Sequence, residues 1–75
     1  MAANMSDLPH VIRLHRKSAR LNRVELALLA GVGKTVIFDI ENGKQSVRWD
    51  TLCKVLAALN ISVQFDSPIL REMTP

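Results

Sequence analysis

The chain has 75 residues, a formal net charge of +3 and 48% hydrophobic residues, of which only three are aromatic. A chain of this length builds one small core, so a second domain is excluded. Its longest apolar run, residues 26–31, is far shorter than the roughly 20 residues of a membrane-spanning helix, and its first residues lack the order of a signal peptide. We therefore expect a cytoplasmic protein. The lone Cys53 excludes an internal disulfide, and no ligand spacing indicates a metal or another cofactor.

The positive charge is concentrated near the N-terminal end of the chain. Five of the ten Lys and Arg residues fall within residues 13–23, where there is no acidic residue. In a helix, Arg13, Arg16, Lys17 and Arg20 recur with the spacing of one helical stripe. The sequence thus predicts a local basic surface, which suits an anionic partner.

Helical periodicity accounts for most of the chain. After a flexible start over residues 1–7, apolar residues at a period of 3.6 predict helices over 8–20, 23–30, 33–41 and 48–59. Gly31 and the Asn42-Gly43 pair supply the stops after the second and third helices. The residues expected to face inward include His15, Leu26, Leu29, Ala30, Ile37, Ile40, Trp49, Leu52, Cys53, Val55, Leu56 and Leu59. Trp49 is expected in the core or at a dimer interface.

Beyond residue 60 the period changes from 3.6 to 2, because Ile61, Val63 and Phe65 alternate with polar residues. This alternation predicts a strand, and a strand needs a partner to satisfy its backbone groups. No other segment alternates in the same way, so the predicted partner is the same strand of a second copy. The predicted domain covers residues 8–66, followed by a flexible tail over 67–75.

Two enzymatic readings are weak. Residues 31–35 (GVGKT) end like a phosphate-binding P-loop, but the first glycine of that pattern is replaced by Leu28 and a helix precedes it in place of a strand. The hydroxyl groups and the two histidines show no spacing that pairs a nucleophile with a base. We interpret His15 as a packed, hydrogen-bonded core residue. We expect no catalysis.

The order of the second and third helices is informative. Two short helices joined by a turn containing glycine form the helix-turn-helix unit, whose second helix enters the major groove of DNA. Its predicted base contacts are the outward side chains of residues 33–41, namely Lys34, Thr35, Val36, Phe38 and Asp39. The predicted phosphate contacts are Asn22, Arg23, Arg20 and Lys44. Phe38 could contact a thymine methyl group, and Asp39 could accept from a cytosine amino group or repel phosphate.

The segments Leu26–Val32 and Ile40–Lys44 resemble the helix-turn-helix of phage-repressor and Cro-type regulators, the XRE family. The continuation through residues 47–61 into an alternating strand is similar to HipB-type antitoxins. This resemblance implies an all-α, four-helix repressor-like domain whose C-terminal strand pairs across a homodimer. It also implies a pseudo-palindromic double-stranded operator, autorepression of a toxin-antitoxin operon, and a HipA-like serine/threonine kinase as partner.

Arg16 and Glu41 match the paired arginine and glutamate of that family, so a structural ion pair is implied. The sequence departs from the family at Asn22-Arg23, where Thr-Gln is usual, and at Gly33-Lys34, where Ser-Arg or Ser-Lys is usual. Phe38 and Asp39 are less usual as well. Two alternatives therefore stay open: a protein-interaction module of the same fold without operator recognition, and a solo repressor unrelated to a toxin.

Overall fold

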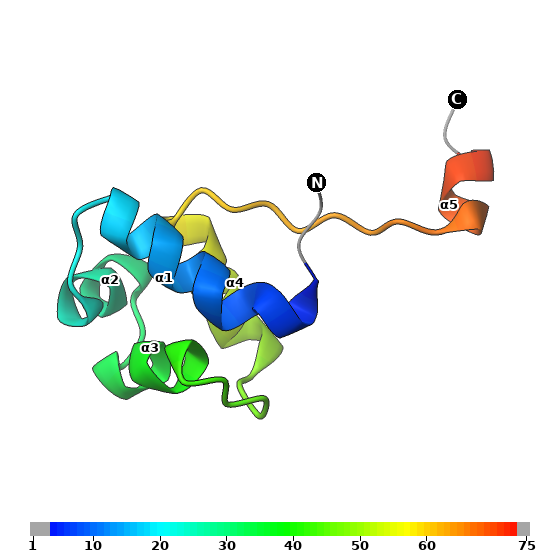
Figure 1. Cartoon of the computed structure of the whole chain (residues 1–75). Coiled ribbons are helices and arrows are strands. Elements are labelled where there is room, and N and C mark those ends of the chain that lie inside the picture. The colour runs from blue at the N-terminus through cyan, green and yellow to red at the C-terminus, as the bar shows by residue number, and fades with distance from the viewer. Residues whose placement is uncertain (1–3, 74–75) are drawn as a thin grey trace.

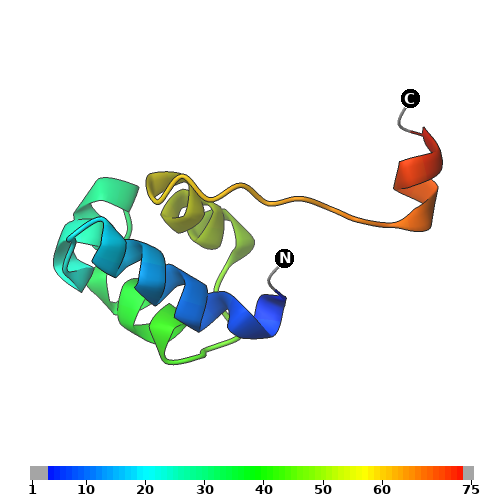
Figure 2. The same ribbon diagram turned by 45° about the horizontal axis from the view of Figure 1, so that its top comes forward.

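The computed structural model describes residues 4–73 as a small helical body with an extended C-terminal arm (Figures 1 and 2). The predicted all-α, four-helix domain is confirmed. A 3-10 turn, η1, is followed by α1–α4, and a short α5 ends the described chain. The bounds are η1 Met5–Asp7, α1 Leu8–Ser18, α2 Arg23–Ala30, α3 Lys34–Glu41, α4 Trp49–Ala58 and α5 Pro68–Met73.

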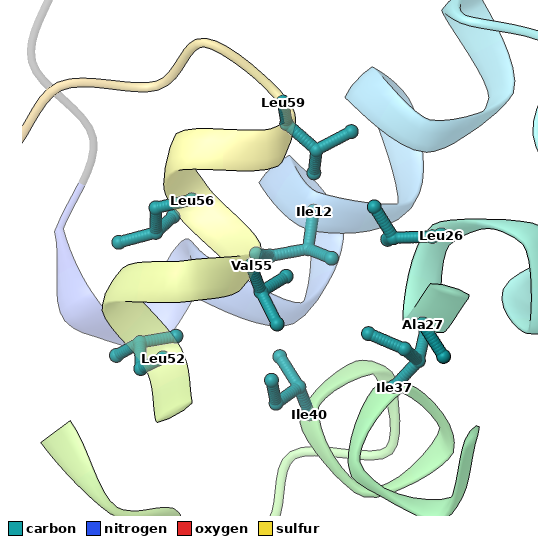
Figure 3. Close-up of a cluster of buried hydrophobic side chains, with 9 residues drawn as sticks. All are labelled: Ile12, Leu26, Ala27, Ile37, Ile40, Leu52, Val55, Leu56 and Leu59. Carbon is teal, nitrogen blue, oxygen red and sulfur yellow. The ribbon is translucent and has the colours of Figure 1, made fainter. Parts of the chain in front are cut away.

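One cluster of aliphatic side chains joins the four main helices. Figure 3 shows Val55 of α4 near the centre, with Ile12 of α1 and Ile40 of α3 on either side. Five of the side chains are essentially inaccessible to solvent: Ile12, Leu26, Ile37, Ile40 and Val55. The rest of the buried cluster is Ala27, Leu52, Leu56 and Leu59. The buried side of α4 thus consists of four residues of the apolar stripe predicted for residues 48–59, namely Leu52, Val55, Leu56 and Leu59.

Three residues expected inside lie elsewhere. Leu29 is largely exposed, His15 is also exposed, and Cys53 is only half-buried. Trp49 is 55% exposed and so lies outside the core, and its place at a dimer interface stays a prediction. The buried arc of each helix is narrower than the sequence predicted, because an eight-residue helix such as α2 packs only one or two side chains per turn against its neighbours. The His15 Nδ1–H still donates to the Val11 carbonyl 2.8 Å away, so the prediction of a hydrogen bond was correct and that of burial was wrong.

The turn between α1 and α2 sets where α1 ends and where α2 begins. α1 ends at Ser18, two residues before the predicted boundary, because Arg20 takes a left-handed conformation with φ of 60°. The Leu21 N–H then bonds back to the Arg16 carbonyl. Asn22 begins α2 with a reciprocal cap: its side chain accepts from the Glu25 N–H at 2.7 Å, and the Glu25 carboxylate accepts from the Asn22 N–H at 2.9 Å.

The predicted strand is not formed in the single chain. Within residues 4–73 there is no strand, and residues 61–67 run as irregular chain away from the body (Figure 1). The physical reason is that a strand exists only with a hydrogen-bonded neighbour, and no described segment lies beside this one. Ile61 packs half-buried against the core, whereas Phe65 is 78% exposed.

The tail contains more regular structure than the sequence indicated. Six residues, Pro68–Met73, form α5, which begins where the Ser67 hydroxyl accepts from the Leu70 N–H at 3.1 Å. An ion pair of 3.0 Å joins Arg71 to Asp66 just before the helix. The flexibility predicted for residues 1–7 and 67–75 stays a prediction, and residues 1–3 and 74–75 lie outside the described part of the chain.

Candidate nucleic-acid interface

A tight glycine turn fixes α2 and α3 relative to each other. Gly31 closes α2 in the left-handed region with φ of 73°, where a side chain would be strained. The Val32 N–H bonds back to the Ala27 carbonyl at 3.0 Å, and the Val32 side chain packs half-buried against the core. Gly33 then begins α3 without a side-chain cap. The result is a rigid helix-turn-helix unit with the outer side of α3 facing solvent.

The five predicted base-contact residues do not share one environment. Lys34 and Thr35 are exposed at the N-terminal end of α3, and Phe38, one turn further on, is 41% exposed. Val36 is half-buried and packs against the core, so less of it is available to a ligand. The free outer surface of α3 therefore consists mainly of Lys34, Thr35 and Phe38, which we call the α3 stripe.

Asp39 lies beside a predicted phosphate contact. The Lys44 Nζ is 3.4 Å from an Asp39 carboxylate oxygen, and both side chains are partly exposed. An exposed pair of this kind is worth about 1 kcal/mol or less, so DNA can compete for Lys44. While the pair holds, the Lys44 charge offsets the repulsion that the Asp39 carboxylate would exert on a phosphate.

Arg16 and Glu41 lie together in the interior between α1 and α3. The Arg16 Nε donates to Glu41 Oε2 at 2.6 Å, and an Arg16 terminal nitrogen donates to Oε1 at 3.0 Å. The other terminal nitrogen donates to the Leu21 carbonyl at 2.9 Å, which ties the same guanidinium to the turn after α1. A two-point contact between an arginine and a buried carboxylate fixes how the two helices are oriented.

Two further arginines approach the same carboxylate. The Nε atoms of Arg13 and Arg23 are each 3.3 Å from Glu41 Oε1. The Glu41 side chain is completely buried, whereas those of Arg13 and Arg23 are 43% and 34% exposed. Three guanidinium groups and one carboxylate leave two positive charges at this corner of the surface. The predicted basic surface therefore exists, but part of it is anchored to a buried acid, which the charge spacing alone did not reveal.

Protonation of Glu41 follows from these contacts. Burial raises the pKa of its carboxyl group, but hydrogen bonds from Arg16 and Arg13 and the charges of Arg16 and Arg23 lower it by more. The net effect is a Glu41 pKa below its ordinary value. The hydrogen bond to Glu41 raises the pKa of Arg16, against the opposing effect of burial. Glu41 is therefore ionised and Arg16 is positively charged at neutral pH.

Three of the four predicted phosphate contacts lie in the turn before α2 or at the first residue of α2. Arg20 is exposed, and the Asn22 side-chain oxygen is occupied by the helix cap. Arg23 differs from the free cation that the sequence suggested. Besides its contact with Glu41, its guanidinium carbon lies 4.8 Å from the centroid of the Phe38 ring. These two residues are 15 positions apart on different helices, and nothing in the local sequence pattern pairs them.

One cavity of about 510 Å³ lies between η1, α1 and the start of α4, and its lining is mainly apolar, including Met5, Leu8, Val47 and Leu52. In the described ranges, no three His, Cys, Asp or Glu side chains come together as a metal site. No helix among residues 4–73 is both long and apolar enough to cross a membrane.

The fold and the α3 stripe define a helix-turn-helix DNA-binding domain, and comparison with known proteins agrees. The helix-turn-helix family HTH_3 matches residues 12–65. The HTH-type transcriptional regulator y4mF of Sinorhizobium fredii is 35% identical over 63 residues, which are 84% of this chain and 83% of that protein. The chain thus belongs to the HTH_3, or XRE, helix-turn-helix family. It is a DNA-binding transcriptional regulator and not an enzyme.

Solved structures show the same fold. A chain of the HipA–HipB–O2–O3 complex has a TM-score of 0.76 at 22% identity, over 91% of this chain and 96% of that one. The HipB–O4 complex gives the same values. An HTH_3 family transcriptional regulator from Vibrio cholerae has a TM-score of 0.67 at 33% identity, over 77% of this chain and 33% of that one.

Proposed function

We propose that this regulator is a sequence-specific repressor that binds a pseudo-palindromic operator as a homodimer. The observation that carries the proposal is the exposed α3 stripe, held on the second helix of a rigid helix-turn-helix unit. The Lys34 cation can contact guanine, and the Thr35 hydroxyl can hydrogen-bond to more than one kind of base. The Phe38 ring can contact the thymine methyl group. Two copies related by a two-fold axis would present α3 to half-sites about 34 Å apart.

Dimerisation is proposed to use the segment with Ile61, Val63 and Phe65. The exposed Val63 and Phe65 side chains support pairing with the same segment of a second copy, and so does the backbone of residues 62–66, which has no hydrogen-bond partner within the described residues. Pairing would satisfy the backbone groups and cover the apolar side chains together. It would also set the separation of the two α3 helices, which makes DNA binding dependent on dimerisation.

We further propose that the operon it represses is its own toxin-antitoxin operon, with a HipA-like serine/threonine kinase as its protein partner. The support is the likeness to chains of the HipA–HipB–O2–O3 complex, together with exposed apolar groups on the C-terminal arm, such as Ile69 and Met73, that a partner could cover. Co-purification of the chain with the product of a neighbouring kinase-like gene tests this part. Loss of co-purification after removal of residues 67–73 would place the contact on the arm.

The test of operator binding is a fluorescence-anisotropy titration against the DNA upstream of the gene and against a scrambled duplex, at low and near-physiological salt. We expect a preference of about 10³-fold or more for the native duplex that persists as salt rises. Lys34→Ala should reduce this preference by about 1–3 kcal/mol for each base contact that is lost. Lys54→Ala, which removes the same charge from an exposed position on α4, should keep the preference. Equal affinity for both duplexes at every salt concentration would refute operator recognition.

A protein-interaction module of the same fold is the second candidate. It is favoured by the acidic Asp39 and the uncapped Gly33 on the reading helix, and by the exposed apolar arm. Such a module would bind its protein partner tightly and bind DNA only weakly, with all DNA binding lost at moderate salt. The same titration separates the two candidates.

A further inference from the structure

Arg23 makes two contacts from α2 to α3 at the same time. Its Nε lies 3.3 Å from the buried Glu41 carboxylate, and its guanidinium carbon lies 4.8 Å from the centre of the Phe38 ring. Within the described part of the chain its two terminal nitrogens have no hydrogen-bond partner. One side chain thus connects the buried ion cluster to the aromatic member of the α3 stripe.

This arrangement restricts how Phe38 can move. A guanidinium group is planar and can stack on a ring face while one edge still donates to a carboxylate. Because Glu41 is completely buried and also held by Arg16, it gives the Arg23 plane a fixed anchor. A lysine at position 23 would keep the charge but would offer neither the plane nor the Nε donor. The Phe38 ring is therefore held against α2 with 41% of the residue exposed.

We infer that Arg23 is a positioning residue that holds Phe38 for contact with a thymine methyl group in the major groove. The base preference of α3 then depends on a side chain from the first helix of the helix-turn-helix unit. The inference rests on the proposed operator binding. Apolar contact with the thymine methyl is the form of base recognition that a phenylalanine can make. The free terminal nitrogens of Arg23 remain available to a backbone phosphate.

Arg13 provides a matched control. Its Nε donates to the same Glu41 oxygen at the same distance of 3.3 Å, and its side chain is exposed to a similar degree. Among residues 4–73, Arg23 makes a cation–π contact with Phe38, and Arg13 makes no contact of this kind. Arg13→Lys and Arg23→Lys therefore remove the same kind of contact with Glu41, and only the second also removes the guanidinium group that lies over the Phe38 ring.

The experiment begins with selection from a pool of randomised duplexes, using the wild-type chain. In the selected duplex each thymine is then replaced in turn by deoxyuridine, which lacks the methyl group. The thymine that Phe38 contacts is the one whose replacement weakens the wild type but not Phe38→Ala. We expect a loss of about fourfold there, because a buried methyl group is worth about 0.8 kcal/mol.

The lysine variants supply the decisive comparison. Arg23→Lys should bind the thymine and deoxyuridine duplexes within about 1.5-fold of each other, whereas Arg13→Lys should keep the ratio near four. Both variants are expected to bind all DNA somewhat more weakly, so the ratio is the readout and not the affinity. Thermal unfolding of both variants checks that they are folded at the temperature of the assay.

The possible results distinguish a failure of this inference from a failure of the proposed operator binding. A wild-type chain that enriches no duplex would overturn operator recognition, and this inference with it. An enriched duplex with no thymine that depends on Phe38 would overturn the inference alone. A fourfold ratio retained by Arg23→Lys would also overturn the inference, because Phe38 would then contact the thymine without Arg23. A ratio lost equally in Arg13→Lys would overturn it as well, because the effect would then come from Glu41 and not from the contact of Arg23 with the ring.

Discussion

Replacing Glu41 should be among the most damaging single changes in this domain. Glu41→Leu would leave Arg16, whose side chain is only 8% exposed, without the carboxylate that neutralises it. Breaking a buried pair in this way typically costs about 3–5 kcal/mol. The whole free energy of unfolding expected for 75 residues is about 4–11 kcal/mol. A large part of the stability of the domain thus depends on one carboxylate.

The converse change should cost less. In Arg16→Met the Glu41 carboxylate keeps Arg13 and Arg23, each at 3.3 Å, so its charge is not left without a partner. The Leu21 carbonyl loses its donor as well. We expect a loss of about 2–3 kcal/mol, at or below the lower end of the range for a broken buried pair. The double variant should lose less than the sum of the single changes, by about 1–3 kcal/mol, because it leaves neither charge buried alone.

Urea unfolding followed by far-UV circular dichroism measures these free energies, with the protein concentration held constant because dimerisation would shift them. Lys44→Met serves as the control, since it breaks an exposed ion pair with Asp39 and should cost about 1 kcal/mol or less. If Glu41→Leu cost no more than Lys44→Met, or if the losses of the double variant were simply additive, the assignment of Arg16 and Glu41 as a buried stabilising pair would be refuted.

Three other predictions test the remaining parts of the structure. Because the folded-state pKa of Glu41 is lowered, its contribution to stability is fully present above the ordinary glutamate pKa of about 4.3. That contribution is lost as the pH falls through the folded-state pKa. An acid titration that compares the stability of Glu41→Gln with that of the wild type will show this loss. Gly31→Ala should destabilise the domain by about 1–2 kcal/mol, because φ is 73° at that position. Gly33→Ser, at φ of −70° with open space for a side chain, should stabilise the domain by a few tenths of a kcal/mol through a new helix cap. Thermal unfolding of both variants measures these effects, and a neutral Gly31→Ala would contradict the prediction. Phe65→Glu should shift the proposed dimer toward monomer in sedimentation velocity and weaken operator binding, and an unchanged dimer would show that this segment is not the interface.

The sequence by itself determined the number, order and approximate bounds of the four main helices. The reason is that the signals are local: a period of 3.6 in the apolar residues, and Gly31 and Asn42-Gly43 as stops. The family resemblance likewise paired Arg16 with Glu41, and the structure brings these two residues together. Local signals also placed Lys34 and Thr35 on the outer side of α3.

Only the tertiary structure decided which side chains of each helix are buried and which charges share a partner. Periodicity gives the direction of an apolar face but not how wide a strip the neighbouring helix covers, so Leu29 and His15 are exposed against expectation. The grouping of Arg13 and Arg23 on Glu41, and of Arg23 on Phe38, joins residues from three helices. Such contacts depend on the angles at which the helices cross, and those angles follow from the packing of the whole core and not from any segment of the sequence.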